Sequence, residues 1–301
     1  MNNAITLDNV TRKFGHTVAL DGVSVSVPPN SICGLLGRNG SGKTTIMSLI
    51  AGQDQPTGGT VRVYGEHPFE HEATLSKISF IRDNQRYPDK YQLEHVLRIA
   101  PEFASRWCGD LAEELVERLR IPAQTPIKKL SRGQLSSVAI VLGLASRAPV
   151  TFLDEPYLGL DITGRALFHD ILVRDVVEYP RTVVLSTHLV EESEALFDRV
   201  IILDRGIVSV DGEADQVRDL AFTASGTADA VAALSQGRVV LRSHAIGGLR
   251  SVTVHEPIDA NVRDQAQTLN VEVAPASIAE LVAAFGDADQ PAQNLEEGVL
   301  A

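Results

Sequence analysis

The sequence of 301 residues is acidic, with 39 Asp and Glu against 27 Lys and Arg and a formal net charge of −12. This balance disfavours a general nucleic-acid binder, which needs a basic surface to meet phosphates. A composition of 44% hydrophobic and 22% charged residues predicts a folded chain with a sizeable core and excludes a fully disordered one.

The N-terminal part predicts short strands, a glycine-rich loop and a helix. Residues 32–36 form an unbroken apolar run, which predicts a buried central strand. The loop after it leads into a helix from about Lys43 to Ala51, which Gly52 ends. Three further segments alternate as half-buried strands do, with turns rich in Pro, Gly and Asn among them: Ile5–Leu7, Val23–Val27 and Val61–Tyr64.

The middle of the chain changes from strand patterns to a helical one and back. From about Gln92 to Arg147, apolar residues recur at the spacing of one helix face. Three apolar strand patterns follow: Val150–Leu153, Thr182–Leu185 and Val200–Leu203. The economical interpretation is an α/β core interrupted by a mainly helical subdomain at about residues 90–148.

After Leu220 the composition shifts, which predicts one domain over residues 1–220 and a small acidic accessory domain over 221–301. Lysine is absent beyond Lys129, and we expect a loosely structured C-terminus from about Ala288. The region shows no recognisable chemistry. Its predicted elements are three strands and a helix: Arg238–Arg242, Val252–Val254, Val271–Val273 and Ile278–Phe285.

The two cysteines, Cys33 and Cys108, lack CxxC or Cys/His spacing, so neither a disulfide framework nor a zinc site is expected. A reducing cytoplasm is the default compartment. Cys33 lies in the apolar run and is expected to be a buried core residue. No stretch has the pattern of a signal peptide or the roughly 20 apolar residues of a membrane span.

The segment Gly37-Arg38-Asn39-Gly40-Ser41-Gly42-Lys43-Thr44 fits the phosphate-loop pattern G-x-x-x-x-G-K-[ST] at every fixed position. Glycines let successive backbone N–H groups point at phosphates, and the following helix aims its positive end at the same place. Lys43 is expected to reach the β- and γ-phosphates, and the Thr44 hydroxyl to bind Mg²⁺. The alternative is a plain glycine-rich turn, which the position between a buried strand and a helix disfavours.

The apolar strand at Val150–Leu153 ends in two carboxylates, Asp154 and Glu155. A carboxylate at the end of a central strand can face a magnesium ion beside the phosphate loop, and the next one can polarise an attacking water. An Asp-Glu pair after a strand is more often a helix cap or a turn, so its meaning depends on the other motifs.

With Leu130-Ser131-Arg132-Gly133-Gln134 just upstream, residues 5–218 resemble the ABC-transporter ATPases, whose signature is LSGGQ. The rest of the pattern appears in order: Phe14 matches the adenine-stacking aromatic, Asp161 in Leu158-Gly159-Leu160-Asp161 the D-loop, and His188 the switch histidine. The resemblance implies a P-loop NTPase (RecA-like) core with an antiparallel β-subdomain and a helical subdomain, beside the small α+β accessory domain.

The resemblance also implies roles for these residues, with ATP and Mg²⁺ as ligands. Glu155 would be the base, His188 would position the γ-phosphate, and Lys43 would complete the catalytic set. Thr44 and Asp154 would hold the metal. The residues expected to bind ATP are Phe14, Gly37, Arg38, Asn39, Gly40, Ser41, Gly42, Lys43, Thr44 and Thr45. In a head-to-tail pair of subunits, Ser131, Arg132, Gly133 and Gln134 would act on the partner's ATP.

The chain departs from the family pattern at two places. Arg132 replaces the third signature residue, glycine, and is expected to point away from the nucleotide or to add positive charge. At the Q-loop, the strand pattern puts Asp83 where the family has glutamine, with Gln85 two residues later. Either side chain could meet magnesium and sense the partner, and Asp83 is the favoured one.

We therefore expect an ATP-hydrolysing subunit that drives a separate transmembrane permease and lies on the cytoplasmic face of the membrane. The family resemblance implies a homodimer. The layout resembles the ATPases of ABC-2-type exporters, which suggests drug, antibiotic or lipid-type cargo and no nucleic-acid partner. The alternatives are a soluble ABC-type ATPase of translation or DNA repair, and a degenerate regulatory nucleotide binder. The single phosphate loop, the absence of long heptads and the intact Lys43, Asp154, Glu155 and His188 disfavour both.

Overall fold

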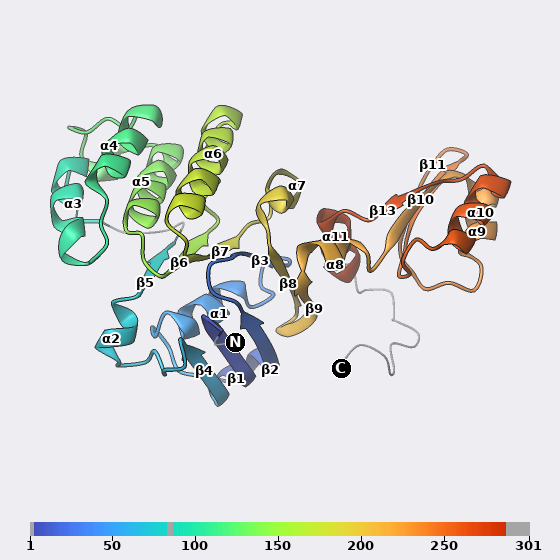
Figure 1. Cartoon of the computed structure of the whole chain (residues 1–301), viewed down its shortest axis with the longest axis horizontal. Helices are drawn as coiled ribbons and strands as arrows, with labels where there is room; N and C mark the ends of the chain where they lie inside the picture. Colours follow the sequence, from blue (N-terminus) through green and yellow to red (C-terminus); the bar gives the residue numbers. More distant parts are fainter. Residues whose placement is uncertain (1–2, 83–86, 89, 287–301) are drawn as a thin grey trace. The chain divides into compact units, whose positions relative to one another are not determined.

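The computed structural model describes residues 3–82, 87–88 and 90–286, and it divides into two compact units, Met1–Gly212 and Glu213–Ala301 (Figure 1). Helix α8 (Ala214–Arg218) is the first helix of the second unit. The predicted boundary between residues 220 and 221 lies just after that helix. Independent folding and function of the two parts remain predictions.

The first unit begins with a three-stranded antiparallel sheet in the order β2-β1-β4. Strand β1 (Ile5–Phe14) is longer than the predicted strand, because it pairs along most of β2 (Thr17–Val27) and also with β4 (Gly58–Val63). Ile5 lies opposite both Val27 and Val63, and all three side chains are buried.

The main sheet of the first unit has the order β5-β6-β7-β3-β8-β9 among the described residues. Its strands β5, β6, β7, β3 and β8 run parallel. Parallel strands are covered on both faces, which explains the continuous apolar runs of β3 and β7. The bounds are β3 (Ile32–Leu36), β5 (Ile78–Ile81), β6 (Val150–Asp154), β7 (Thr182–Ser186), β8 (Arg199–Asp204) and β9 (Ile207–Glu213).

Helices cover this sheet on both sides (Figure 1). Helix α1 (Lys43–Ile50) packs with the three-stranded sheet, whereas α3 (Leu93–Ile99), α4 (Gly109–Arg118), α5 (Arg132–Ala145) and α6 (Ile162–Glu178) lie on the other side. The predicted helical insert is confirmed as α3 to α5. Shorter helical pieces are α2 (Glu72–Leu75), η1 (Ala100–Glu102), η2 (Ile127–Lys129), α7 (Val190–Ser193) and η3 (Glu194–Leu196).

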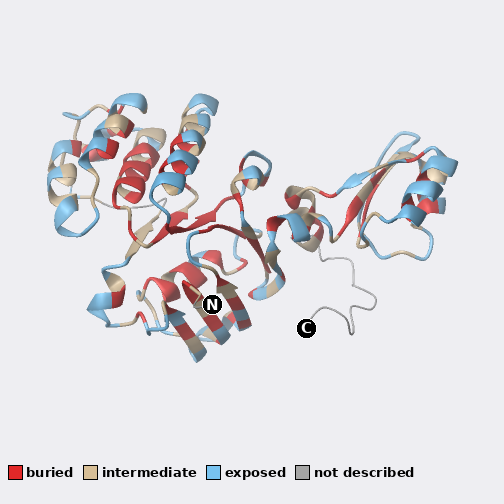
Figure 2. Ribbon diagram, in the orientation of Figure 1, coloured by how far each residue is buried: buried red, intermediate tan, exposed pale blue. Residues whose placement is uncertain are grey.

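The buried residues lie along the main sheet, α1 and α5, while the outer helix faces are exposed (Figure 2). Cys33 belongs to this core, as predicted, and burial raises the pKa of its thiol to about 12, so it stays an unreactive thiol at neutral pH. No helix among the described residues is long and apolar enough to cross a membrane.

The second unit contains a β-α-β-β-α-β segment that forms an antiparallel sheet in the order β11-β12-β10-β13. This connectivity and order are those of the split-βαβ, ferredoxin-like motif. Helices α9 (Ala228–Ser235) and α10 (Ala260–Leu269) share a hydrophobic core with one face of the sheet. The strands are β10 (Phe222–Thr227), β11 (Val240–Ile246), β12 (Leu249–Val254) and β13 (Glu272–Pro275), and α11 (Ile278–Gly286) follows them.

The predicted α+β accessory fold is thus confirmed, with shifted and added elements. The strand predicted at 238–242 lies at 240–246, and β10, α9 and α10 lack any counterpart in the sequence-based prediction. The predicted loose segment from Ala288 lies outside the described residues.

Candidate functional site

The phosphate-loop pattern lies where it was predicted, between the end of β3 and the start of α1. Gly37 has a φ of 135° and Gly42 a φ of 110°, which side-chain-bearing residues rarely adopt. A Cβ at Gly37 would lie 2.2 Å from the carbonyl oxygen of Leu203, and one at Gly42 would lie 2.7 Å from Leu20. The pattern's fixed glycines are therefore required by backbone geometry and close packing.

Lys43 is folded back into this loop and is 7% exposed. Its Nζ donates hydrogen bonds to the carbonyl oxygens of Gly37 at 2.7 Å and Arg38 at 3.1 Å. Burial lowers the pKa of the amine, while Glu155 and Asp154 oppose that shift. An ammonium group and the first turn of a helix thus converge on one small volume, which suits a polyphosphate.

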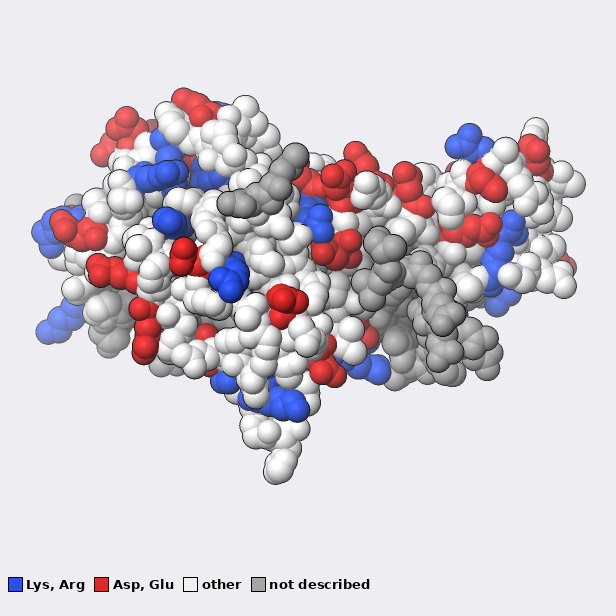
Figure 3. All heavy atoms as spheres, turned by 60° about the horizontal axis from the view of Figure 1, so that its bottom comes forward, with Lys and Arg blue, Asp and Glu red and all other residues white. Residues whose placement is uncertain are grey.

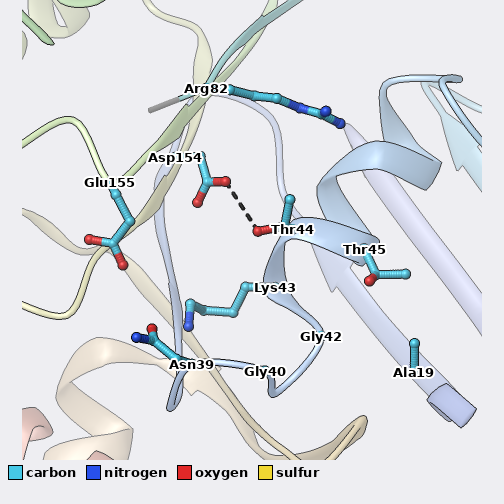
Figure 4. A pocket seen from close by; sticks show the side chains of 10 residues that line it. All are labelled: Ala19, Asn39, Gly40, Gly42, Lys43, Thr44, Thr45, Arg82, Asp154 and Glu155. Carbon is cyan, nitrogen blue, oxygen red and sulfur yellow. Dashed lines mark hydrogen bonds between the residues drawn. The ribbon is translucent and has the colours of Figure 1, made fainter. Parts of the chain in front are cut away.

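Asp154 lies across from the loop at the end of β6, and Thr44 begins α1 (Figure 4). The Thr44 hydroxyl donates a hydrogen bond to Asp154 Oδ2 at 3.2 Å. Burial raises the pKa of Asp154, partly offset by that hydrogen bond and by the charge of Lys43. One hydroxyl and one carboxylate are hard oxygen donors of the kind that bind Mg²⁺ together with substrate phosphates.

The described residues contain no cluster of three or more His, Cys, Asp or Glu side chains that could hold a metal alone. The Thr44 hydroxyl and the Asp154 carboxylate fit a metal that arrives with a phosphate ligand.

Glu155 and His188 meet because their strands are neighbours. β6 pairs with β7 in parallel, with Asp154 opposite Ser186, so the residues that follow both strands emerge at the same edge. Glu155 has a φ of 51° and its amide donates to the Ser186 carbonyl at 2.9 Å. Its Oε2 lies 2.6 Å from His188 Nδ1. A carboxylate oriented by an imidazole next to the loop is a suitable general-base arrangement.

The phosphate loop, Lys43, Thr44, Asp154 and Glu155 border one cavity of about 430 Å³, whose lining does not include His188. Figure 4 shows Asp154 and Glu155 on one side of it and Lys43, Thr44 and Thr45 on the other. The lining comprises Ala19, Asn39, Gly40, Gly42, Lys43, Thr44, Thr45, Arg82, Asp154 and Glu155.

Arg82 and Ala19 were not predicted as site residues. Arg82 directly follows β5, which pairs with β6 so that Ile81 lies opposite Leu153, and this pairing carries Arg82 to the cavity. Its Nη2 donates to Ser48 Oγ at 2.7 Å and to Gln53 Oε1 at 2.5 Å. The sequence feature that could have identified Arg82 is its position immediately before Asp83, the expected Q-loop residue. Asp83 and Gln85 themselves lie outside the described residues.

Phe14 ends β1 and is half exposed, and its ring lies 4.4 Å from the guanidinium carbon of Arg12. It is not part of the lining of this cavity.

The four signature residues lie at the start of α5, outside the cavity lining. Ser131 caps the helix: its Oγ accepts from the Gln134 amide at 3.3 Å, and Gln134 Oε1 accepts from the Ser131 amide at 2.9 Å. Ser131 and Arg132 are both exposed. The N-terminal end of α5 is therefore exposed at Ser131 and Arg132 and does not line the cavity of the chain's own phosphate loop.

The segment 158–161, the predicted D-loop, packs on this helix start. A Cβ at Gly133 would lie 2.1 Å from the carbonyl oxygen of Gly159, so the two backbones touch directly. The Ser136 hydroxyl donates to the carbonyl of Leu158. Asp161 then caps α6 by accepting from the Gly164 amide at 2.7 Å.

Comparisons with known proteins agree on one family. The sequence pattern of the family described as "ABC transporter" matches residues 20–158. An uncharacterized ABC transporter ATP-binding protein of Methanocaldococcus jannaschii is 32% identical, over 68% of this chain and 76% of the relative. The daunorubicin resistance ATP-binding protein of Streptomyces coeruleorubidus is 31% identical, over 72% and 70%. The aliphatic sulfonates import ATP-binding protein of Burkholderia lata is 32% identical, over 70% and 64%.

Solved structures agree as well. The dimeric structure of a bacterial ABC transporter cassette has a TM-score of 0.61 and 26% identity, over 70% of this chain and 98% of that one. The dimeric post-hydrolysis state of an ATP-binding cassette bound to ADP and Pi has a TM-score of 0.60, also at 26% identity, with the same coverage.

Proposed function

This chain belongs to the family of ABC transporter ATP-binding proteins, and on that premise we propose that it hydrolyses ATP to energise a separate membrane permease that exports its cargo. The observation that carries the hydrolytic part is the Glu155–His188 contact of 2.6 Å beside the phosphate loop. A nucleotide-binding module without turnover would not require a carboxylate held by an imidazole at that place.

The loop and Lys43 bind the phosphates of ATP. When bound, Mg²⁺ would be held by Thr44 and Asp154 and would supply neutralising charge at the phosphate oxygens. Glu155 accepts the proton of the attacking water, a bond forms from that water to the γ-phosphorus, and the bond to the β-phosphate oxygen breaks, which leaves ADP and phosphate. His188 orients Glu155 and positions the γ-phosphate. Asp83 or Gln85 would sense the partner.

Two copies pair head to tail, so that Ser131 and Gly133 of one subunit complete the site of the other. Two findings support this: the signature residues lie outside the chain's own cavity, and the related solved cassettes are dimeric. The exposed N-terminal end of α5 would hold the γ-phosphate of the partner's ATP. Phe14 would stack on adenine, and Asp161 would approach the partner across the interface.

A groove in the helical part suits the permease. It has a volume of about 380 Å³, lies between β5 and the helices after it, and is lined in part by Tyr91, Val96, Trp107 and Leu142. Phe103, also in its lining, is 82% exposed, which is unusual for so large an apolar side chain. We assign this groove to a segment of the permease, which would place the subunit at the cytoplasmic face of the membrane.

Export is the proposed direction, and relatives named for daunorubicin resistance and for Nod factor export match this chain at 31% and 29% identity. The accessory unit after residue 212 adds to that likeness, since the layout resembles the ATPases of ABC-2-type exporters. The sulfonate importers match as well, so direction is tested separately. Drug, antibiotic or lipid-type molecules are the proposed cargo.

The other candidate function is a soluble ABC-type ATPase in translation or DNA repair. The charge pattern argues against it, since basic and acidic side chains are interspersed on the face in Figure 3 and form no continuous basic stripe there.

Phosphate release from Mg·ATP by the purified chain tests the hydrolytic function, with omission of Mg²⁺ as the control. No release above the control would refute it. Inside-out vesicles that contain the chain and the permease encoded nearest to it test the direction: ATP-dependent uptake of a drug or a fluorescent lipid indicates export. Stimulation of hydrolysis by RNA or DNA, without effect of the permease, would favour the alternative.

A further inference from the structure

The D-loop, residues 158–161, is held on one side by the signature helix α5. Leu158 accepts from Ser136, and Gly159 packs against the backbone of Gly133. Both contacts involve main-chain atoms of the D-loop, and the second requires glycine at position 159. Any displacement of the start of α5 therefore displaces the D-loop with it.

Arg165 holds the D-loop on its other side. It lies in the first turns of α6, where its Nε donates to the carbonyl oxygen of Leu160 at 3.1 Å. Its Nη1 contacts Glu192 Oε1 at 2.6 Å. Glu192 belongs to α7, which begins two residues after His188. One guanidinium thus links the D-loop to the segment that carries the switch histidine.

The chemistry of the guanidinium suits this link. Its N–H donors form a rigid planar fork, so two acceptors on different segments can be held at once at a fixed mutual distance. The side chain of Arg165 is 23% exposed and that of Glu192 43%, so the pair is partly shielded from water. A lysine would offer one flexible point charge and could not fix both acceptors in the same geometry.

Helix α6 provides a firm base for Arg165. Two residues of α6, Phe168 and His169, contact the buried Tyr157, which directly precedes the D-loop. His169 Nε2 lies 2.8 Å from the Tyr157 hydroxyl, and the Phe168 ring meets the Tyr157 ring edge-on at 5.4 Å. The helix cannot shift freely relative to the start of the D-loop, so Arg165 keeps its position between the two segments.

We propose that Arg165 is a positioning residue for hydrolysis, which makes the signature helix, the D-loop and the Glu155–His188 pair move as one unit. This inference rests on the proposed function, because it assumes that α5 meets the partner's ATP. Binding of that ATP against Ser131 then fixes the position of the D-loop. Arg165 transmits the position of the D-loop through Glu192 to the segment that carries His188. Nucleotide binding at Lys43 does not pass through this link.

A double-mutant cycle on the full-length chain tests the proposal. Arg165→Ala and Glu192→Ala each lower kcat of Mg·ATP hydrolysis about fivefold, while the Kd for ATP changes less than about twofold. The kcat of the double variant is no lower than that of the more impaired single variant, because both changes break the same link. Arg165→Lys, which keeps the charge, stays as impaired as Arg165→Ala.

Arg174→Ala is the matched control. Arg174 lies in the same helix and binds a carboxylate, Glu114, at 2.7 Å and 2.9 Å, yet it contacts neither the D-loop nor α7 in any of these bonds. The kcat of the Arg174→Ala variant should equal that of the wild-type protein. The melting temperatures of all variants distinguish a folding defect from the predicted loss of kcat. If Arg165→Ala is unstable, Arg165→Lys takes its place in the comparison.

Three results would overturn the proposal: a kcat of Arg165→Ala within about twofold of wild type, losses that multiply in the double variant, or an ATP affinity that falls as far as kcat. Wild-type protein without any hydrolysis would instead refute the proposed function itself, so the two failures are distinguishable.

Discussion

His188 Nδ1 lies 2.6 Å from Glu155 Oε2, although 33 residues separate the two along the chain. Adjacent parallel strands bring them together, and Glu155 adopts a left-handed backbone conformation at the end of β6. Such strain at a residue with a reactive side chain is typical of functional sites.

Glu155→Gln should bind Mg·ATP but lower kcat by at least about 100-fold, because the amide cannot accept the proton of water. The trapped nucleotide should yield a dimer in size-exclusion chromatography with light scattering. Glu191→Gln, an exposed neighbour of the switch segment, is the control and should behave as wild type. A Glu155→Gln variant that stays monomeric at saturating ATP would contradict the ATP-bridged dimer.

Lys43→Ala should abolish hydrolysis and weaken ATP binding about 10- to 100-fold, as expected for the loss of a charged hydrogen-bond donor. Isothermal titration calorimetry measures the affinity. Lys77→Ala removes an equivalent charge outside the cavity and should leave both quantities unchanged. Normal turnover by Lys43→Ala would refute the phosphate-loop assignment.

Asp154→Asn should abolish Mg²⁺-dependent hydrolysis and stabilise the nucleotide-free protein. The folded-state pKa of Asp154 is raised, chiefly by burial, so its ionised form costs stability, and that cost grows as pH rises through the folded pKa. The advantage of Asn in melting temperature should therefore be larger at pH 8 than at pH 4, close to the ordinary carboxyl pKa of 3.8. A variant less stable than wild type at pH 8 would contradict this prediction.

Asp175→Ala should destabilise the chain by about 3–5 kcal/mol, because it leaves two arginines without their shared carboxylate. Asp175 contacts Arg181 at 2.7 Å and Arg147 at 2.6 Å, and the Arg181 side chain is 1% exposed. Urea unfolding measures the change. The exposed pair of Glu114 and Arg174 is the control, and Glu114→Ala should cost only about 0–1 kcal/mol. An equal loss of unfolding free energy in Asp175→Ala and Glu114→Ala would contradict the prediction.

Phe103→Asp should uncouple the chain from its permease without changing its own ATP hydrolysis. A charge in the apolar groove opposes burial of an apolar segment. Co-purification of the tagged chain with the permease encoded nearest to it measures the loss. Val177→Asp places the same charge on another exposed apolar residue, 75% exposed on α6, and should leave co-purification intact. Equal recovery of permease with both variants would show that the groove is not the docking site.

Strong local signals made part of the fold predictable from sequence. Residues 32–36 are an apolar run closed by the glycine loop, and the structure has a strand with those bounds, followed by a helix that begins at Lys43 as predicted. The fold class and the ATP-binding family are likewise confirmed. In each case the deciding information lies within a few consecutive residues.

Elements stabilised by distant partners were not predictable in this way. Strand β10 has the sequence FTASGT, in which Phe222 is the single large apolar side chain, so its alternation with Ala224 and Gly226 is a weak signal, and pairing on both sides by β12 and β13 makes it a strand. Helix α10 is mostly polar, and it is anchored by Val262 and Ala266. Arg82 reaches the cavity only through the pairing of β5 with β6. The Arg165–Glu192 contact joins residues 27 apart and leaves no local pattern.

The contact between Gly133 and Gly159 has a consequence for variation of this sequence. Neither position has room for even one methyl group, because each would drive it into the other's main chain. In a saturation library, alanine at either position should behave as a wedge between the signature helix and the D-loop. Two residues without side chains would thus be as intolerant of substitution as the chemically reactive ones, and a selection for activity would keep both as glycine.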